Sequence, residues 1–588
     1  MVLSFSKHVP AEGLPRFSGS LATLLIGVFL FCCCAVIRSS AQTNASATSH
    51  ADTLRGTVVN SVTREPIGRA LVFSPDNRFA TMTDDRGQFE FNFPRSESGQ
   101  AATAVSTFFG PGPARESRLQ YVGSHRPANL KAGKPGFLFD DNGGQGVLVS
   151  ADQQVVTITL NPEALVVGRI LLPTADYLDR IQVELYRREL REGREHWDTA
   201  GTTRSRTDGS FRFAGLPAGA YKLVTRELLD RDPLTFDPRG QLFGYPPVYY
   251  SSAADFAAAE VIRLSAGTTF LANISPIRRE YYRVKVGVAN APRGIQLQVW
   301  PQGHPGPGYS LGFNSEEESI EGSLPNGTYT VRAASYSPAA MTGTLNITVS
   351  GGSTPGATMM LLPNPSITMT VTEDFQDPET LNRVRNAYDS GAGNPRRPNY
   401  LNVSLVPIEE FGYTPGASVR PPNGPDDQSL VIENVQPGSY RVQATTGAGY
   451  ISSITSGGTD LLRKPLLVSA GSAPPPMEIT LRDDGAQVDG TVEASIRGST
   501  FRVPAVHFVP MSDGGGQFRV AWTYGDGRFQ VQQLPPGAYR VLAFDRQRPD
   551  LEYATEEALS QYDSNAQVIH VVAGQKEHLQ LPLINRSE

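Results

Sequence analysis

The chain has 588 residues, of which 39% are hydrophobic, and a formal net charge of −6. This content is sufficient for several cores of roughly 100 residues each, and it excludes a disordered chain. Lysine and arginine are not gathered into stripes or tails, which argues against nucleic acid as a partner, while 57 glycines and 45 prolines are typical of a turn-rich β protein.

The N-terminus has the pattern of a secretory signal. Lys7 and Arg16 precede an apolar run from residue 21 to residue 37, and Ser39-Ser40-Ala41 then leads into a polar stretch. We expect residues 1–41 to be a signal peptide that is cleaved after Ala41. The alternative is an uncleaved membrane anchor, because 17 apolar residues are close to the shortest segment that spans a bilayer. No span is expected after cleavage.

All three cysteines, Cys32, Cys33 and Cys34, lie inside that apolar run. The mature chain would therefore contain no disulfide, which favours a bacterial envelope over a eukaryotic ectodomain. The small-residue pattern of a lipoprotein signal does not precede any of them. We expect an exported protein located in the periplasm, on the outer cell surface or outside the cell.

The first predicted module covers residues 52–161. An alternating strand at residues 54–59 is followed by a turn and a second strand within residues 63–73. A further turn and a third strand occupy residues 83–91.

These residues resemble the carboxypeptidase regulatory-like domain, a transthyretin-like (prealbumin-like) β-sandwich. The motifs are Gly-x-Val in the first strand, Pro-Ile-x-x-Ala-x-Val in the second and Thr-Asp-x-x-Gly-x-Phe-x-Phe in the third, and they cover residues 52–93. The family continues with a Leu-Pro-x-Gly-x-Tyr turn, which this module lacks. A long insertion at residues 94–146 stands there instead, before a closing strand at 155–160. The resemblance implies an accessory sandwich and not the peptidase, whose zinc motifs are absent.

A short motif recurs four times in the rest of the chain. Each copy has an apolar residue, then a glycine three positions later, then a tyrosine two positions after the glycine. The copies lie 108, 111 and 99 residues apart, which fits separate small domains and not a solenoid. The glycines are Gly219, Gly327, Gly438 and Gly537, and the tyrosines are Tyr221, Tyr329, Tyr440 and Tyr539.

We interpret the motif as a strand, a tight turn and a returning strand. Proline would preset one turn dihedral and glycine would supply the positive one. The buried tyrosine would bond its hydroxyl to the turn backbone, like the tyrosine corner of β-sandwiches. Alternating apolar residues lead into three copies, whereas the copy at Gly327 offers only Ile320, out of register.

The sequence thus predicts an all-β protein, a tandem array of about five prealbumin-like or Ig-like β-sandwich modules after the signal peptide. The later modules also resemble collagen-adhesin B-type repeats and starch-binding-like, carbohydrate-binding-like folds. Their short junctions favour a semi-rigid rod. After the first module, we place the boundaries at 164–277, 281–363, 366–482 and 486–584.

The second module carries a longer insertion after its motif, in which residues 253–260 are expected to form a short helix. The last module has a counterpart at residues 553–562.

Catalytic and metal sites are not expected. Gly308-Tyr309-Ser310-Leu311-Gly312 matches the nucleophile-elbow pattern, but no helical pattern follows the serine. The histidines are scattered without metal-ligand spacing. Asp84-Asp85 and Asp426-Asp427 could offer oxygen ligands to calcium, but acceptance of hydrogen bonds from turn amides explains them more simply. No cofactor is predicted.

Aromatic residues in loops are the binding candidates. Tyr245, Tyr249 and Tyr250 could stack on a sugar ring, or they could pin the insertion to its own sandwich or to the next module. Solitary alternatives are Trp197, Trp300 and Trp522.

Two functions remain from this reasoning. The first is a non-enzymatic exported protein that acts as an envelope or cell-surface interaction or spacer module. The second is carbohydrate binding through aromatic loops. The expected partners are a polysaccharide or another envelope protein, and exposed edge strands could also pair with a partner strand.

Overall fold

The computed structural model describes residues from Asp52 to Ile584, which belong to one compact unit, Asp52–Glu588. Within that range it leaves out 94–126, 128, 139–145, 151–152, 173–180, 230–240, 353–355, 378, 380–381, 383–399, 410–413, 494–503, 512–516 and residues 77, 254, 293, 338, 425 and 525. The predicted signal segment and most of the first insertion lie outside the described residues. Among the helices that are described, none is long and apolar enough to cross a membrane.

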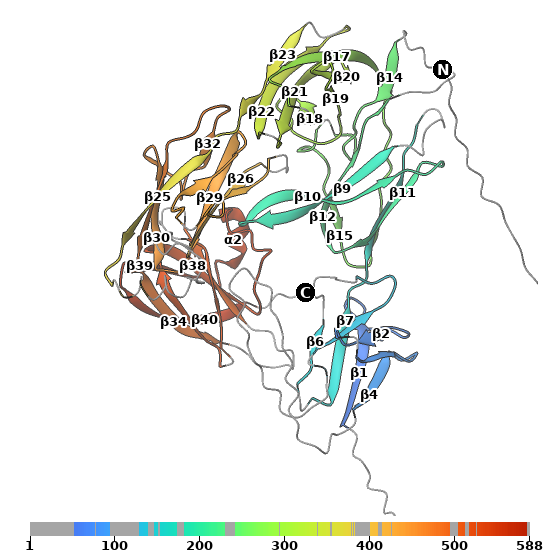
Figure 1. Cartoon of the computed structure of the whole chain (residues 1–588). Coiled ribbons are helices and arrows are strands. Elements are labelled where there is room, and N and C mark those ends of the chain that lie inside the picture. Colours follow the sequence, from blue (N-terminus) through green and yellow to red (C-terminus); the bar gives the residue numbers. More distant parts are fainter. Residues whose placement is uncertain are drawn as a thin grey trace, which may run out of the picture. The chain divides into compact units, whose positions relative to one another are not determined.

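The protein is all-β, as predicted, and its described part contains five hydrophobic cores that follow one another along the chain (Figure 1). They draw their buried residues from 54–160, 164–274, 284–361, 367–481 and 486–581. We refer to them as the first to fifth cores. The strands around them form β-sandwich modules of the prealbumin or Ig-like kind.

Each core has the same strand pairing in its first sheet. The opening strand lies parallel to the closing strand and antiparallel to the strand that precedes the turn motif. The first and last strands of a module therefore close it on itself. From the first core to the fifth, these opening, closing and preceding strands are β1 (Asp52–Asn60), β7 (Val155–Leu160) and β4 (Gln88–Phe93); β8 (Ala164–Arg169), β16 (Thr269–Leu271) and β11 (Ser210–Leu216); β17 (Arg279–Ala289), β23 (Ala357–Met360) and β20 (Ser319–Pro325); β25 (Ile367–Asp374), β33 (Met477–Arg482) and β28 (Leu430–Ile432); and β34 (Ala486–Glu493), β40 (Lys576–Ile584) and β37 (Arg528–Leu534).

Further strands extend two of these first sheets. In the third core, β13 (Leu228–Leu229) and β14 (Leu242–Tyr245) add to one edge and β19 (Gly312–Asn314) to the other. In the fourth core, β30 (Tyr450–Ser456) and β31 (Thr459–Asp460) follow the closing strand.

The second sheet of each later core is built around the strand that follows the turn motif. In the fifth core that strand also pairs with β40, which joins the strands into one seven-stranded sheet. In spatial order the second-sheet strands are β3 (Ala80–Met82), β2 (Leu71–Phe73), β5 (Asn129–Gly133) and β6 (Val147–Leu148); β10 (Arg194–Arg204), β9 (Gln182–Arg191), β12 (Gly219–Thr225) and β15 (Ile262–Leu264); β18 (Gln296–Pro301), β21 (Gly327–Ser335), β22 (Met341–Val349) and β24 (Leu362–Pro363); β27 (Ala417–Ser418), β26 (Leu401–Pro407), β29 (Gly438–Thr446) and β32 (Leu466–Val468); and β36 (Arg519–Trp522), β35 (Ala505–Pro510), β38 (Gly537–Phe544) and β39 (Gln567–Val571).

The alternation of apolar residues explains which strand face is buried. In β4, Phe89, Phe91 and Phe93 are buried while the residues between them are exposed. Successive side chains of a strand point to opposite faces, so a period of two places all three rings in the first core. Burying one such ring contributes roughly 1.5–3 kcal/mol.

The tyrosine corner is confirmed in all four copies of the motif. In each copy the tyrosine hydroxyl donates to the backbone carbonyl four residues earlier, and the ring is buried. The bonds run from Tyr221 to Pro217 (2.7 Å), from Tyr329 to Pro325 (3.0 Å), from Tyr440 to Gln436 (2.7 Å) and from Tyr539 to Pro535 (2.7 Å).

The predicted role of the motif glycine is wrong. Gly219 and Gly438 do not have positive φ, whereas the residue four positions before the motif glycine does in three copies: Gly215 (69°), Asn434 (58°) and Gln533 (56°). A Cβ on Gly219 or Gly438 would instead contact the ring of the tyrosine two residues later, at 3.6 Å and 3.5 Å. Residues i and i+2 share a strand face, so the glycine leaves room for the ring.

Two smaller expectations need correction. The third copy does have a strand before its motif, β20, which pairs with β17 as its counterparts do. Residues 253–260 form turns in the described positions and not a helix. The counterpart insertion in the fifth module does contain helical turns, α2 (Glu556–Leu559) and the 3₁₀ turn η2 (Ser560–Tyr562).

The connections between cores are short. Three residues separate β7 from β8, β24 from β25 and β33 from β34, and seven separate β16 from β17. Linkers of this length leave little conformational freedom between neighbouring sandwiches.

We predict that Tyr221→Phe destabilises the second module by about 1 kcal/mol, because the buried carbonyl of Pro217 loses its donor. For a module of this size, that loss corresponds to a melting temperature lower by roughly 4–8 °C in calorimetry. Tyr524→Phe is the matched control, since Tyr524 is 64% exposed. Equal melting of parent and Tyr221→Phe would show that the bond contributes nothing.

The corners also predict alkaline unfolding. Burial raises the pKa of Tyr221 to about 12 and raises the pKa of Tyr329, Tyr440 and Tyr539 as well. Because the folded pKa lies above the unfolded value of about 10, this stabilisation is complete below pH 10 and is lost as the pH rises through the folded pKa. We expect these four phenols to ionise together with loss of β circular dichroism. Reversible ionisation of all tyrosines near pH 10 with the fold intact would contradict this.

Candidate functional site

The predicted tyrosines and the Gly-x-Ser-x-Gly motif meet at the boundary between the second and third cores. The contacts join the insertion of the second module to residues 301–312 of the third, which we call the junction loop. Strand β14 of the insertion pairs antiparallel with β17, so that Leu242 lies opposite Tyr281 and Gly244 opposite Arg279. The second module thereby contributes strands to the first sheet of the third core.

Tyr249 holds the junction loop directly. Its ring is only 2% exposed, and its hydroxyl donates to the carbonyl of Pro307 at 2.8 Å. Tyr245 is buried in β14, and Tyr250 is partly exposed and packs edge-on against Phe270, with 5.9 Å between ring centroids. In this conformation Tyr245 and Tyr249 present no open face on which a sugar could stack.

A buried lysine fixes the insertion to the outer face of the second module. Lys222 in β12 donates from Nζ to the carbonyls of Phe256 (2.7 Å) and Ala257 (3.1 Å). The same ammonium lies 4.9 Å from the ring of Trp197 and 4.8 Å from that of Phe256. Hydrogen bonds and cation–π contacts together compensate the burial of its charge. Trp197, at 2% exposure, is therefore a packing residue.

Glycines allow the junction loop to approach the insertion closely. A Cβ on Gly306 would lie 2.8 Å from the hydroxyl oxygen of Tyr249 and 2.9 Å from Cβ of Phe256. Gly308 has a φ of 129°, and a Cβ there would lie 2.5 Å from the ring of Pro247. Larger residues would separate the two surfaces.

Ser310 is bonded to Glu227 and does not form a nucleophile elbow. Its backbone N–H and its hydroxyl both donate to Oε1 of Glu227, each at 2.7 Å. Strand β19 follows at Gly312–Asn314, where an elbow would need a helix. Burial raises the pKa of Glu227 to about 7, although the bonds from Ser310 act in the opposite direction.

A cavity of about 420 Å³ lies beside the junction loop. Its polar walls include Glu184, Arg226 and Tyr186, which bond to one another. Tyr186 donates its hydroxyl to Glu184 at 2.6 Å, and Arg226 donates to the same carboxylate at 3.1 Å. The charged groups of the cavity are thus satisfied by the protein itself.

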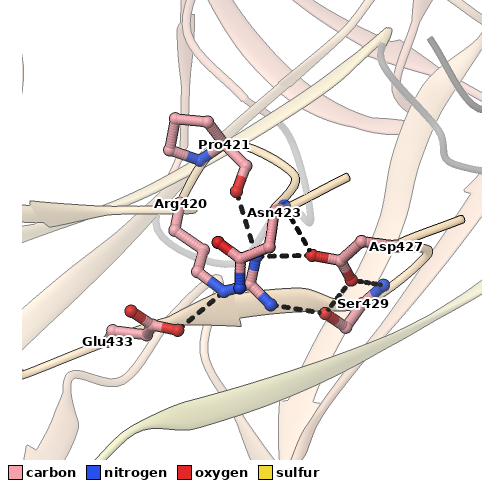
Figure 2. A network of polar contacts seen from close by, with 6 residues as sticks. All are labelled: Arg420, Pro421, Asn423, Asp427, Ser429 and Glu433. Atoms are coloured by element: carbon pink, nitrogen blue, oxygen red, sulfur yellow. Dashed lines mark hydrogen bonds and ion pairs between the residues drawn. The ribbon is translucent and has the colours of Figure 1, made fainter. Parts of the chain in front are cut away.

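The aspartate pairs act in turns. Asp84 Oδ1 accepts the amides of Arg86 and Gln88. Figure 2 shows the corresponding network at Asp427, whose carboxylate accepts the amide of Asn423 and the amide and hydroxyl of Ser429.

Arg420 completes that network. It donates to Asp427 at 2.6 Å, and its Nε lies 2.7 Å from Glu433 (Figure 2). The turn amides and Arg420 hold the pKa of Asp427 well below its usual range. These carboxylate oxygens are therefore occupied by the loop. Elsewhere in the described residues, no group of three or more potential metal ligands comes together.

Sequence reasoning missed two residues. Glu227 carried no local signal, because its partner Ser310 lies 83 positions away. Tyr524 escaped notice although it is 64% exposed beside Trp522, which is 53% exposed. Ala521 and Thr523 are buried, so the period of two would have placed both aromatic rings on the outer face. Trp300 is buried, at 8% exposure.

Comparison with known proteins leaves the family open. No protein-family model matches this chain, and no curated protein does. The similar solved structures include the Bacillus anthracis TIE protein (10% identity, 69% of this chain and 68% of that one, TM-score 0.14). They also include the open conformation of the pilus adhesin SpaC from Lactobacillus rhamnosus GG (11% identity, 53% and 43%, TM-score 0.16). A third is a pair of B repeat units of the collagen binding protein of Staphylococcus aureus (12% identity, 74% and 100%, TM-score 0.12). With TM-scores this low, these similarities carry no argument about function.

We predict that Gly306→Ala loosens the junction, because the new methyl group collides with Tyr249 and Phe256. Overpacking of this kind typically costs 1–3 kcal/mol. The expected result is faster protease cleavage within residues 301–312 and a lower first melting transition. Gly294→Ala is the control, since a Cβ there has no atom within 4 Å. Identical cleavage of the two variants would contradict the packing described above.

Proposed function

We propose that this chain is an exported, non-enzymatic protein of the bacterial envelope that acts as a spacer or interaction module. The observation that supports it best is the junction between the second and third cores. There, the side chains that could have served chemistry or binding are used to join one sandwich to the next. Tyr249 bonds to Pro307, Ser310 bonds to Glu227, and β14 pairs with β17.

We further propose that each core marks one module, with the boundaries 52–161, 164–277, 281–363, 366–482 and 486–584. The repeated parallel pairing of opening and closing strands supports this division. For the first module we propose the carboxypeptidase regulatory-like family. The motifs in residues 52–93 support it, and they coincide with strands β1, β2 and β4.

Short junctions and shared sheet edges suit a spacer. A chain of sandwiches joined by three to seven residues keeps its modules close to one orientation, whereas long flexible linkers would not. In the envelope, such a protein would hold a terminal module away from its anchor point or present exposed edge strands to a partner protein.

A specific observation favours carbohydrate binding as a second candidate function. Trp522 and Tyr524 are exposed neighbours on one face of the edge strand β36 and the turn after it. Paired aromatic planes on a sheet surface suit stacking against the C–H face of a sugar ring. This pair, and not the buried Tyr245 and Tyr249, is where we place that activity.

A pull-down on insoluble polysaccharides separates the two functions. The spacer function predicts that the mature chain flows through, and that Trp522→Ala with Tyr524→Ala changes nothing. Carbohydrate binding predicts retention that a soluble sugar displaces and that the double variant loses. Tyr336→Ala is the control, because this tyrosine is 54% exposed on a different module. Protease digestion of whole cells tests export independently, and a chain protected in intact cells yet digested after outer-membrane permeabilisation would be periplasmic.

A further inference from the structure

Glu227 connects the second module to the junction loop through both its backbone and its side chain. It lies between β12 and β13, and its backbone N–H donates to the carbonyl of Gly308 at 3.1 Å. Its Oε1 accepts the N–H and the hydroxyl of Ser310. Three hydrogen bonds from one residue therefore hold residues 308–310 against the insertion.

The carboxyl group lies in a place that disfavours its charge. Although the residue as a whole is partly exposed, Oε2 is inaccessible to solvent and makes no hydrogen bond of normal geometry. The same holds for the hydroxyl of Tyr281, which perturbs the pKa of Glu227. An ionised carboxylate with a dry, unpaired oxygen is costly, whereas the protonated form is neutral and can donate.

The groups around Glu227 do not compensate for this cost. Tyr281 of β17, Tyr309 of the junction loop and Tyr329 of β21 face it with neutral phenols. Arg226 favours the ionised form from the adjacent position, but its guanidinium bonds to Glu184. Arg279 of β17 lies nearest to Tyr309 and acts on that phenol. Burial is the larger effect, and it raises the pKa of Glu227 to about 7.

We propose that Glu227 is a pH-sensitive latch, which holds the second and third modules together when its carboxyl group is protonated and loosens them when it is ionised. The latch would make the junction stiffer in an acidic environment and more compliant in a neutral or alkaline one.

The direction follows from linkage. In the opened junction the carboxyl group returns to its ordinary pKa of 4.5. Because the docked pKa lies above this value, the extra stability is complete below about pH 4.5 and is lost as the pH rises through about 7. Within that window, the population of the open junction should rise about tenfold per pH unit.

A second pair crosses the same junction. His304 Nδ1 of the junction loop lies 2.6 Å from Asp255 Oδ2 of the insertion, and it is charged only when protonated. Loss of that proton would weaken the contact in the same direction. His304→Gln therefore has to be measured beside Glu227→Gln to separate the two.

The test is hydrogen exchange of the mature chain between pH 5 and pH 8, corrected for the intrinsic pH dependence of exchange. In the parent, protection of residues 305–312 should fall with pH, while protection of residues 535–541 in the fifth module should stay constant. Glu227→Gln, which keeps an acceptor oxygen but cannot ionise, should remove the pH dependence of residues 305–312. His304→Gln should retain most of it.

Ser310→Ala gives an independent readout. The Ser310 hydroxyl stabilises the ionised carboxylate, so its removal should move the midpoint of the transition to higher pH. This variant decides the matter even if Glu227→Gln fails to fold. A parent without pH-dependent protection, a dependence that persists in Glu227→Gln, or an unmoved midpoint in Ser310→Ala would each overturn the latch.

Discussion

The bond between each corner tyrosine and the carbonyl four residues before it is the constraint on which the later modules depend. It fixes the turn through which the chain passes from the first sheet to the second, so the two layers enclose a common core. The hydroxyl must find an acceptor when the ring is buried, and the turn supplies one at the same offset in each copy. Because the motif glycine has no side chain, the ring can lie against the backbone two residues earlier.

Closure by the first and last strands completes each module and also limits how modules can be linked. A closing strand beside the opening strand ends at the point where the next module begins, so only a few connecting residues are needed. The second junction is reinforced further, because the insertion after β12 supplies strands to the neighbouring sheet. The insertion of the fifth module packs differently, with Leu551 and Leu559 covering Phe544 on the outer face of its own sheet.

The sequence predicted what depends on local periodicity. Alternating residues such as Phe89 and Phe91 located the strands, and the spacing from Pro217 to Tyr221 predicted the corner bond. Reasoning failed where tertiary contacts decide the outcome. The exposure of Tyr249 could not be read locally, because its partner Pro307 belongs to another module. Glu227 was invisible for the same reason, and the turn dihedral was assigned to Gly219 although Gly215 adopts it.

The central claim is that separate cores close independently around their own corners. Stretching single molecules of the mature chain from both ends tests this most directly. The account predicts a series of rupture events, each releasing about 100 residues, or roughly 350 Å of extended chain. A single rupture that releases the whole of Asp52–Glu588 at once would contradict it.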